Sequence, residues 1–281
     1  MILVTGSGGM VGSYLRQVFD GEELFLTERR SMDITNYETV RQTFAKAKPN
    51  VVIHLAAATD VDRCETDADW AFRVNVLGTQ NIVAACQEWG CLLVHVSTSS
   101  VFNGQREGSY TEFDLPDPIN TYGKTKWEAE KIVQSFLDRY FIVRASWMIG
   151  GGKERDKKFV AKIIQLCQTR EILDVVDDKF GTITYARDLL ATIRFLLGTP
   201  FYGVYHVASR GVCTRYDIAL EIAKNLRSKV KVKPVSSDRF PAPAPRPRSE
   251  AILGYKLVLM GKDHLPPWQD TVETYLKEWQ C

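Results

Sequence analysis

Tyr122 and Lys126, four residues apart, form the pair in this sequence with the clearest chemical meaning. On a helix, an i, i+4 spacing puts both side chains on one face. A phenol ordinarily has a pKa of about 10, and a neighbouring ammonium should lower that pKa, so that the phenol can exchange a proton with a carbonyl oxygen. Thr98, which follows the apolar run Leu92–Ser97, could hold the same oxygen by a hydrogen bond. These residue types predict proton transfer to a carbonyl group.

A glycine-rich turn near the start of the chain is a second chemical signal. It follows the apolar run Ile2–Thr5 and precedes an amphipathic stretch. A GxxGxxG spacing permits a tight turn, close approach of the backbone to a pyrophosphate, and free N–H groups at a helix start. The strand before it and the helix after it favour a dinucleotide-binding loop over a plain turn. The predicted cofactor contacts in this loop are Gly6, Gly9, Met10, Val11 and Gly12.

The end of the second apolar run should select between the two nicotinamide cofactors. Thr27 stands where an acid would hold the ribose hydroxyls, and Arg29 and Arg30 could bind the additional phosphate of NADPH. The sequence therefore favours NADPH, with NAD as the alternative because Glu28 is also present. An exposed charged turn without a function is the other interpretation. Further predicted cofactor contacts are Asp33 and Ile34 beside the adenine, and the small residues Ala56, Ala57 and Ala58.

Strands and helices alternate through the first half of the chain, which predicts an α/β fold with a Rossmann-type, doubly wound parallel sheet. The expected strands are Ile2–Thr5, Leu24–Thr27, Val51–Ala56, Leu92–Ser97 and Phe141–Ser146, and the expected helices are Met10–Phe19, Asn36–Lys48, Ala68–Trp89 and Asn120–Tyr140. Residues 1–150 should bind the dinucleotide, with 186–208 returning to that domain. Residues 151–281 should form a smaller C-terminal substrate-binding lobe, which contains the irregular Pro241–Pro247 loop.

Composition excludes several classes of protein. The 281 residues are 45% hydrophobic and 25% charged, with a net charge of +2, which argues against a nucleic-acid surface. No apolar stretch is long enough for a bilayer, and no signal peptide is expected. We expect no metal, a cytoplasmic location and reduced thiols, and a homodimer is an arrangement that the sequence leaves open. The scattered cysteines are Cys64, Cys86, Cys91, Cys167, Cys213 and Cys281.

These segments resemble the extended short-chain dehydrogenase/reductase family, and within it the dTDP-4-dehydrorhamnose reductase (RmlD-like) branch. The resemblance runs over nearly the whole chain and rests on 6–12, 56–65, 94–98, 101–104, 120–126, 144–147 and 240–247. It implies an NADPH-dependent reductase of a nucleotide-linked 4-keto-6-deoxy sugar. Thr98, Tyr122 and Lys126 would be catalytic by this likeness. The substrate contacts would be Thr98, Ser99, Trp147 and Arg246, although a core aromatic is the alternative for Trp147.

The sequence departs from the family pattern near the expected sugar. The family usually has an acid and an aromatic where this chain has Ser99 and Ser100, so we expect a wider and less acidic pocket. Its serine after the Arg-Pro turn corresponds to Glu250, and its Pro-Thr to Ile183-Thr184. These changes leave the exact sugar open.

Two other functions stay open on this fold. The first is a nucleotide-sugar epimerase or dehydratase, although Ser99 stands where a dehydratase would place its acid. The second is a non-catalytic regulatory subunit, against which the intact Thr98, Tyr122 and Lys126 argue.

Overall fold

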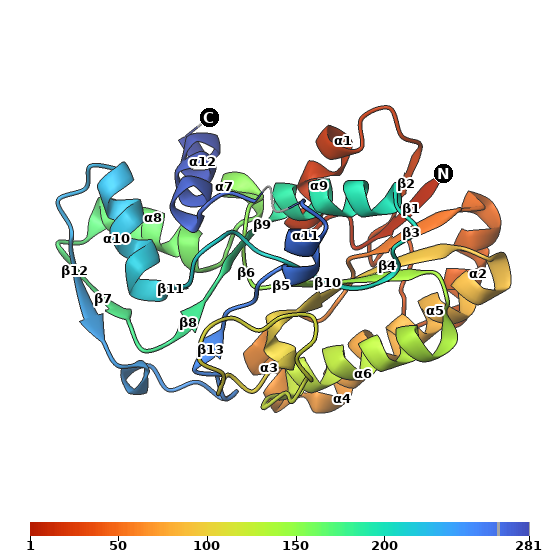
Figure 1. Cartoon of the computed structure of the whole chain (residues 1–281), viewed down its shortest axis with the longest axis horizontal. Helices are drawn as coiled ribbons and strands as arrows, with labels where there is room; N and C mark the ends of the chain where they lie inside the picture. Colours follow the sequence, from red (N-terminus) through yellow and green to blue (C-terminus); the bar gives the residue numbers. More distant parts are fainter. Residues whose placement is uncertain (263–264, 281) are drawn as a thin grey trace.

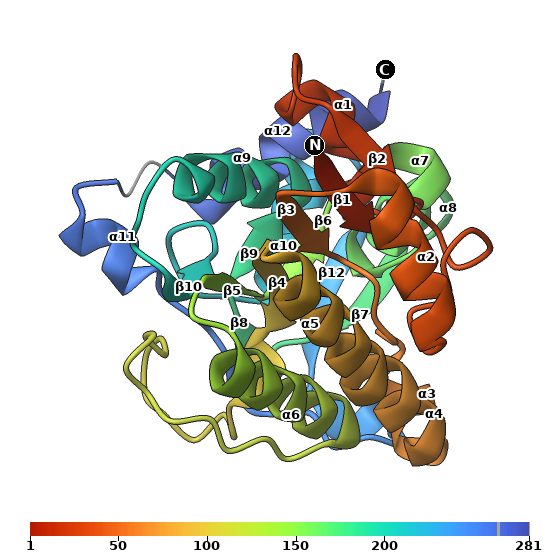
Figure 2. The ribbon, with the colours of Figure 1, turned by 90° about the vertical axis from the view of Figure 1, so that its right-hand side faces the viewer.

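The computed structural model describes residues 1–262 and 265–280. Among these residues, six parallel strands form the main sheet in the order β10-β5-β4-β3-β1-β2 (Figures 1 and 2). Their bounds are β1 Ile2–Thr5, β2 Leu24–Leu26, β3 Val51–His54, β4 Leu92–Thr98, β5 Tyr140–Ala145 and β10 Gly203–Val207. β2 lies on one side of β1, and β3, β4, β5 and β10 lie on the other side, so the strand order reverses at β1. A ligand crevice is expected at the carboxyl ends of the strands where the order reverses.

Helices cover both faces of this sheet, as the alternation of buried residues on its strands requires. On β1, Leu3 packs into a core with α2, α5 and α6, while Ile2 and Val4 face a second core with α9. The bounds are η1 Val11–Tyr14, α1 Leu15–Val18, α2 Tyr37–Ala47, α3 Val61–Thr66, α4 Ala68–Phe72, α5 Gly78–Trp89, α6 Thr121–Phe136 and α9 Ala186–Leu197. The predicted fold class is confirmed.

Two predicted helices differ from the observed ones. The stretch expected as one helix from Met10 to Phe19 is a 3-10 turn, η1, followed by the short α1. The expected helix Ala68–Trp89 is divided into α4, a π-helical segment at Arg73–Leu77, and α5. Asn75 lies in the π segment and is almost fully buried, and its side chain makes polar contacts that a plain repeat of hydrophobic spacing does not anticipate. Such bulges often occur at functional sites.

The C-terminal part continues directly from β5 and forms three small sheets, β11-β8-β13, β12-β7 and β6-β9 (Figure 1). Its hydrophobic residues belong to the same core cluster as the α9 face of the main sheet, so both parts of the chain share one interior. The bounds are β6 Trp147–Ile149, α7 Gly152–Arg155, α8 Phe159–Thr169, β7 Ile172–Val176, β8 Phe180–Gly181, β9 Ile183–Tyr185, β11 Cys213–Thr214, α10 Arg215–Asn225, β12 Lys231–Val235, β13 Ser249–Glu250, α11 Tyr255–Leu259 and α12 Trp268–Gln280.

Three further findings concern the described residues as a set. None of their helices combines the length and the apolar character that a membrane span needs. No group of three histidine, cysteine or acidic side chains among them could hold a metal ion. Five of the cysteines are buried free thiols, and Cys281 lies outside the described residues.

Candidate active site

The glycine-rich loop after β1 has the shape that a dinucleotide needs. Gly6 adopts φ +67°, and a Cβ on it would lie 2.7 Å from the Ala56 nitrogen at the end of β3. A Cβ on Gly12 would lie 1.8 Å from the Ser7 carbonyl oxygen. Neither position admits a side chain, so the backbone stays bare where a pyrophosphate would approach. Gly9 closes the turn by donating to the Gly6 carbonyl at 3.2 Å, and Met10 and Val11 begin η1.

A cavity of about 480 Å³ adjoins this loop and carries a concentration of positive charge. Its walls are Ser7, Gly12, Ser13, Arg16, Leu26, Glu28, Arg30, Ser31 and Arg155. The Arg155 guanidinium reaches across to the Gly9 carbonyl at 3.5 Å. Three guanidiniums beside a glycine loop fit a phosphate-bearing dinucleotide, because guanidinium geometry matches phosphate.

The two arginines predicted to select the cofactor lie in different surroundings. Arg30 lines the cavity, but Arg29 is not among its walls. The Arg29 side chain is 80% exposed and lies 3.8 Å from the Asp33 carboxylate. Arg16 and Arg155 were missed by the sequence analysis. Arg155 is the last residue of α7, more than a hundred residues after the glycine loop, and only the fold brings it to the cavity.

The residues predicted beside the adenine serve the local fold in this structure. The Asp33 carboxylate accepts hydrogen bonds from the backbone and the hydroxyl of Thr35, at 2.9 and 2.8 Å, and these bonds hold its pKa below the usual value. Ile34 is buried, and its side chain fills the space above Gly78 of α5. Both contacts fix the turn after β2.

The alanines after β3 are linked to the helix that carries Tyr122. Ala56 and Ala57 are half-buried, and Ala58 is buried. Asn75 holds Ala58 from both sides, accepting from its nitrogen at 2.8 Å and donating to its carbonyl at 3.1 Å. The same amide donates to the Thr125 hydroxyl on α6 at 3.0 Å. Asn75 therefore ties the end of β3 to the helix that carries Tyr122.

The structure brings Thr98, Tyr122 and Lys126 together at the carboxyl end of β4. Thr98 is the last residue of β4, and the other two lie in the first turns of α6. Asn120 starts that helix, because its side chain accepts from the Gly123 nitrogen at 2.8 Å. Tyr122 packs against the cluster of Ala58, Cys64 and Ala71.

The protonation of this group differs from the expectation. Burial raises the pKa of Tyr122 to about 12, and a hydrogen bond with Thr98 opposes that shift. The expected lowering by Lys126 was wrong for this arrangement, because the ammonium points toward the sheet. Lys126 Nζ donates to the Val96 carbonyl at 2.9 Å and lies 3.2 Å from His95 Nε2. Burial lowers the pKa of Lys126 to about 8, opposed by the Glu130 charge.

The other residues predicted to contact substrate come from three different parts of the chain. Trp147, on β6, is half-buried, and the Arg215 guanidinium stacks 3.8 Å from its ring centre. Ser99 is buried, and its hydroxyl donates to that of Ser146 at 3.2 Å. Arg246 binds Asp62 of α3 at 2.9 Å, so the Pro241–Pro247 loop is tied to the main sheet's side of the molecule. Arg215 was missed, because an arginine at a helix start is ordinary in sequence.

Comparison with known proteins decides the family. The model of the RmlD substrate binding domain matches residues 1–281. The chain belongs to the RmlD substrate binding domain family.

Members of the RmlD family are similar to the chain over most of its length. The dTDP-4-dehydrorhamnose reductase of Aggregatibacter actinomycetemcomitans is 32% identical, covering 89% of this chain and 90% of that protein. The crystal structure of a dTDP-4-dehydrorhamnose reductase from Clostridium acetobutylicum has a TM-score of 0.95 at 36% identity, covering 100% and 99% of the two chains. That of Bacillus anthracis, in complex with NADP, has a TM-score of 0.94 at 36% identity, covering 99% and 98%.

One expectation drawn from the RmlD-family pattern needs correction. The serines at 99 and 100 predicted a less acidic pocket, but Glu250 supplies a carboxylate at the same place. Its Oε1 accepts from the Ser100 hydroxyl at 2.6 Å, and its Oε2 accepts from Trp147 Nε1 at 2.9 Å. The acidity is therefore retained, although it comes from β13 instead of the end of β4.

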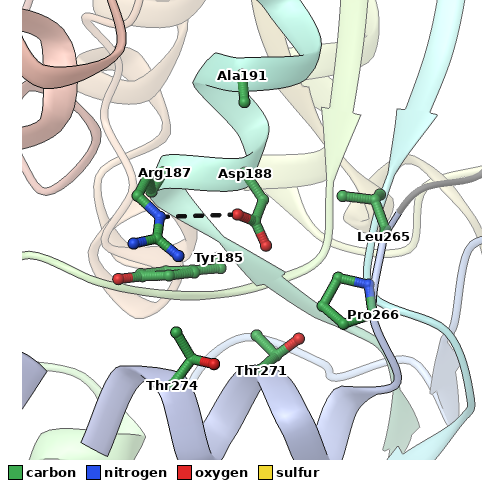
Figure 3. A pocket seen from close by; sticks show the side chains of 8 residues that line it. All are labelled: Tyr185, Arg187, Asp188, Ala191, Leu265, Pro266, Thr271 and Thr274. Carbon is green, nitrogen blue, oxygen red and sulfur yellow. Dashed lines mark ion pairs between the residues drawn. The ribbon is translucent and has the colours of Figure 1, made fainter. Parts of the chain in front are cut away.

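A second cavity, of about 140 Å³, lies between α9 and α12 and contains none of the predicted site residues (Figure 3). Its walls are Tyr185, Arg187, Asp188, Ala191, Leu265, Pro266, Thr271 and Thr274. Figure 3 shows the Arg187 guanidinium beside the Tyr185 ring and Thr271 and Thr274 on the opposite helix. The cavity lies in the contact between two helices.

Proposed function

We propose that this protein is an NADPH-dependent reductase of a nucleotide-linked 4-keto-6-deoxy sugar, of the kind that dTDP-4-dehydrorhamnose reductases act on. The observation that carries the proposal is the meeting of Thr98, Tyr122 and Lys126 at the carboxyl end of β4. They share the sheet's carboxyl edge with the glycine loop after β1, at which three arginines line a cavity. The NADP complex of the similar Bacillus anthracis enzyme supports the choice of cofactor.

The residues of the chain account for the proton that reduction requires. A pKa of about 12 keeps Tyr122 protonated at neutral pH, which is the form that can donate to a carbonyl oxygen. The Thr98 hydroxyl can hold the same oxygen while charge develops on it. The hydride for the carbonyl carbon is the chemistry that bound NADPH supplies. After the transfer, the Thr98 hydroxyl can stabilise the phenolate by a hydrogen bond.

The substrate side offers groups for a sugar diphosphate. Arg215 and Arg246 lie close enough that the charge of Arg246 lowers the pKa of Arg215, although burial is the larger cause and Glu250 opposes both. Two guanidiniums in one cleft can bind a diphosphate. Trp147 offers an aromatic face for the sugar.

We also propose that different parts of the chain bind the cofactor and the substrate. Residues 1–150 with 186–208 would bind the cofactor, and residues 151–281 outside that return would bind the substrate. The support is that α9 packs on the main sheet and β10 pairs with β5 in it, whereas the other C-terminal strands form separate sheets. A cytoplasmic location fits the buried free cysteines, and a homodimer would be tested by analytical ultracentrifugation.

The proposal is tested by mixing purified protein with NADPH and dTDP-4-dehydrorhamnose. We expect NADPH absorbance to fall only when the keto sugar is present. The matched control is Tyr122→Phe. An epimerase would return its hydride and give no net oxidation, so conversion of the sugar without loss of NADPH would overturn the proposal, as would complete inactivity.

A further inference from the structure

Glu250 is held at a fixed position in the cleft by donors from two parts of the chain. Ser100 follows β4, and Trp147 lies on β6, and each donates to a different oxygen of the Glu250 carboxylate. The backbone carbonyl of Glu250 accepts from the Ser146 hydroxyl at 2.9 Å, and Ser146 in turn accepts from Ser99. Three of the positions at which the sequence departs from its family pattern, 99, 100 and 250, therefore meet in one hydrogen-bonded cluster.

This carboxylate accepts from Ser100, two residues after Thr98, and from Trp147, on whose ring the Arg215 guanidinium stacks. Its charge contributes to the raised pKa of Tyr122, after burial and the charge of Cys64, and it supports the charged form of Arg215 against burial. Among residues 1–262 and 265–280, no lysine or arginine nitrogen comes within salt-bridge distance of it. The negative charge therefore stays available to a ligand in the cleft.

The carboxylate also has room for another donor. An ionised carboxylate can accept about four hydrogen bonds, and the structure gives the side chain of Glu250 one donor on each oxygen. The side chain is half-buried, so part of it is open to a ligand. Since it can only accept, it suits a hydroxyl and repels an anion.

We propose that Glu250 is a specificity-determining residue that accepts a hydrogen bond from the C3 hydroxyl of the sugar. The inference rests on the proposed function. When the C4 carbonyl oxygen lies at Thr98 and Tyr122, the neighbouring ring carbons are C3 and C5. Of these two carbons in a 4-keto-6-deoxyhexose, only C3 carries a free hydroxyl, because C5 carries the ring oxygen and a methyl group. The site therefore selects neutral keto sugars with a C3 hydroxyl over 3-deoxy sugars.

The test compares kcat/KM for a 4-keto-6-deoxy sugar nucleotide and for its 3-deoxy analogue. The wild-type protein should prefer the hydroxylated sugar about tenfold to a hundredfold, as expected for a hydrogen bond to a charged group. Glu250→Ser should abolish most of this preference. Glu250→Gln, which keeps the size and one acceptor, should retain an intermediate preference. In both variants the change should appear mainly in KM.

The control variant is Glu273→Gln, which removes an exposed carboxylate of α12 that pairs with Lys277 and should keep the wild-type preference. Thermal melting verifies that each variant is folded. If Glu250→Ser does not fold, Glu250→Gln alone still tests the role of Glu250. A folded Glu250 variant with an unchanged preference would overturn the role of Glu250 alone. Absence of NADPH oxidation by the wild-type protein with either sugar would instead overturn the proposed function.

Discussion

The polar atoms of Tyr122 and Lys126 meet different surroundings, although the two side chains share one helix. The phenol faces Thr98 and the cleft, whereas the ammonium donates to the Val96 carbonyl beneath it. One group is therefore a half-buried acid with a high pKa, and the other is a buried cation with a low pKa. We therefore predict a different effect on turnover for the replacement of each residue.

Replacing Tyr122 by phenylalanine removes the transferable proton and keeps the ring that packs against Cys64 and Ala71. General acid catalysis contributes about a hundredfold to ten-thousandfold, so kcat should fall by roughly that factor. The affinity for NADPH, measured by fluorescence titration, should stay nearly the same. A variant that retains most of its turnover would remove Tyr122 from the mechanism.

The pH dependence of the reduction should report Lys126. Its pKa is lowered to about 8 by burial, so the ammonium that donates to the Val96 carbonyl on β4 is present below that pH and is lost as the pH rises through it. We expect kcat/KM to decline above a pH of about 8. Lys126→Arg keeps its charge at every accessible pH, so the alkaline decline should disappear in that variant even if its activity is lower. An unchanged decline would assign it to another group.

Arg29 and Arg30 provide a matched pair for the cofactor. Arg30 lines the cavity beside the glycine loop, while Arg29 extends into solvent beside Asp33. Arg30→Ala should weaken NADPH binding about tenfold to a hundredfold, because it removes a charge-assisted bond to phosphate, and should leave NADH binding nearly unchanged. Arg29→Ala should alter neither. Equal losses of NADPH affinity in the two variants would mean that the arginines act only by long-range electrostatics and that Arg30 makes no direct contact with the phosphate.

At the scale of the element, the start of α6 determines where Tyr122 lies. Asn120 is almost fully buried, caps the helix through Gly123, and donates to the Pro245 carbonyl at 3.0 Å. One side chain therefore connects α6, which carries Tyr122, to the Pro241–Pro247 loop.

Asn120→Ala should lower the free energy of unfolding by about 1 to 3 kcal/mol, from the lost cap and the unpaired carbonyl, and should lower kcat as well. Asn36 caps α2 in the same way but is exposed and remote. Asn36→Ala should cost about 1 kcal/mol and leave kcat unchanged. Urea unfolding and steady-state turnover measure both effects. Normal turnover in Asn120→Ala would show that the cap does not position the tyrosine.

Elements with regular periodicity could be predicted from the sequence, and those shaped by a single contact could not. Strand β1, the glycine loop and the Asn36 cap of α2 all follow from local rules. The π segment depends on Asn75 reaching both Ala58 and α6, which are distant in sequence. Arg155 and Glu250 were not predicted beside the glycine loop and Ser100 for the same reason, because only the fold brings α7 and β13 to those places.

At the scale of the whole molecule, the C-terminal helix is tied to the cofactor loop. Tyr14, which follows the glycine loop, and Tyr185 both donate to the Glu278 carboxylate on α12. The Tyr14 hydroxyl also accepts from the Gly151 nitrogen at 2.8 Å. Burial and the bond to Glu278 raise the pKa of Tyr14 to about 12, so the phenol stays a donor at physiological pH.

Glu278→Ala should lower the free energy of unfolding by about 2 to 5 kcal/mol, because it leaves two buried hydroxyls without their acceptor. It should also weaken NADPH binding, since Tyr14 supports the first turn after the glycines. Glu273→Gln, on the exposed face of the same helix, should change neither quantity by more than about 0.5 kcal/mol. Thermal unfolding and cofactor titration measure the two effects. Wild-type stability and wild-type NADPH affinity in Glu278→Ala would contradict the predicted link between α12 and the glycine loop.

The late arrival of β10 at the edge of the main sheet has a consequence during translation. β5 ends at Ala145 and its outer neighbour begins only at Gly203. At roughly 5 to 20 residues per second, a ribosome needs several seconds to make the intervening stretch. Throughout that time the outer edge of β5, which β10 later covers, has no strand partner and could pair with another nascent chain. Synthesis of this protein should therefore depend on chaperones more than that of a sheet whose strands emerge in spatial order.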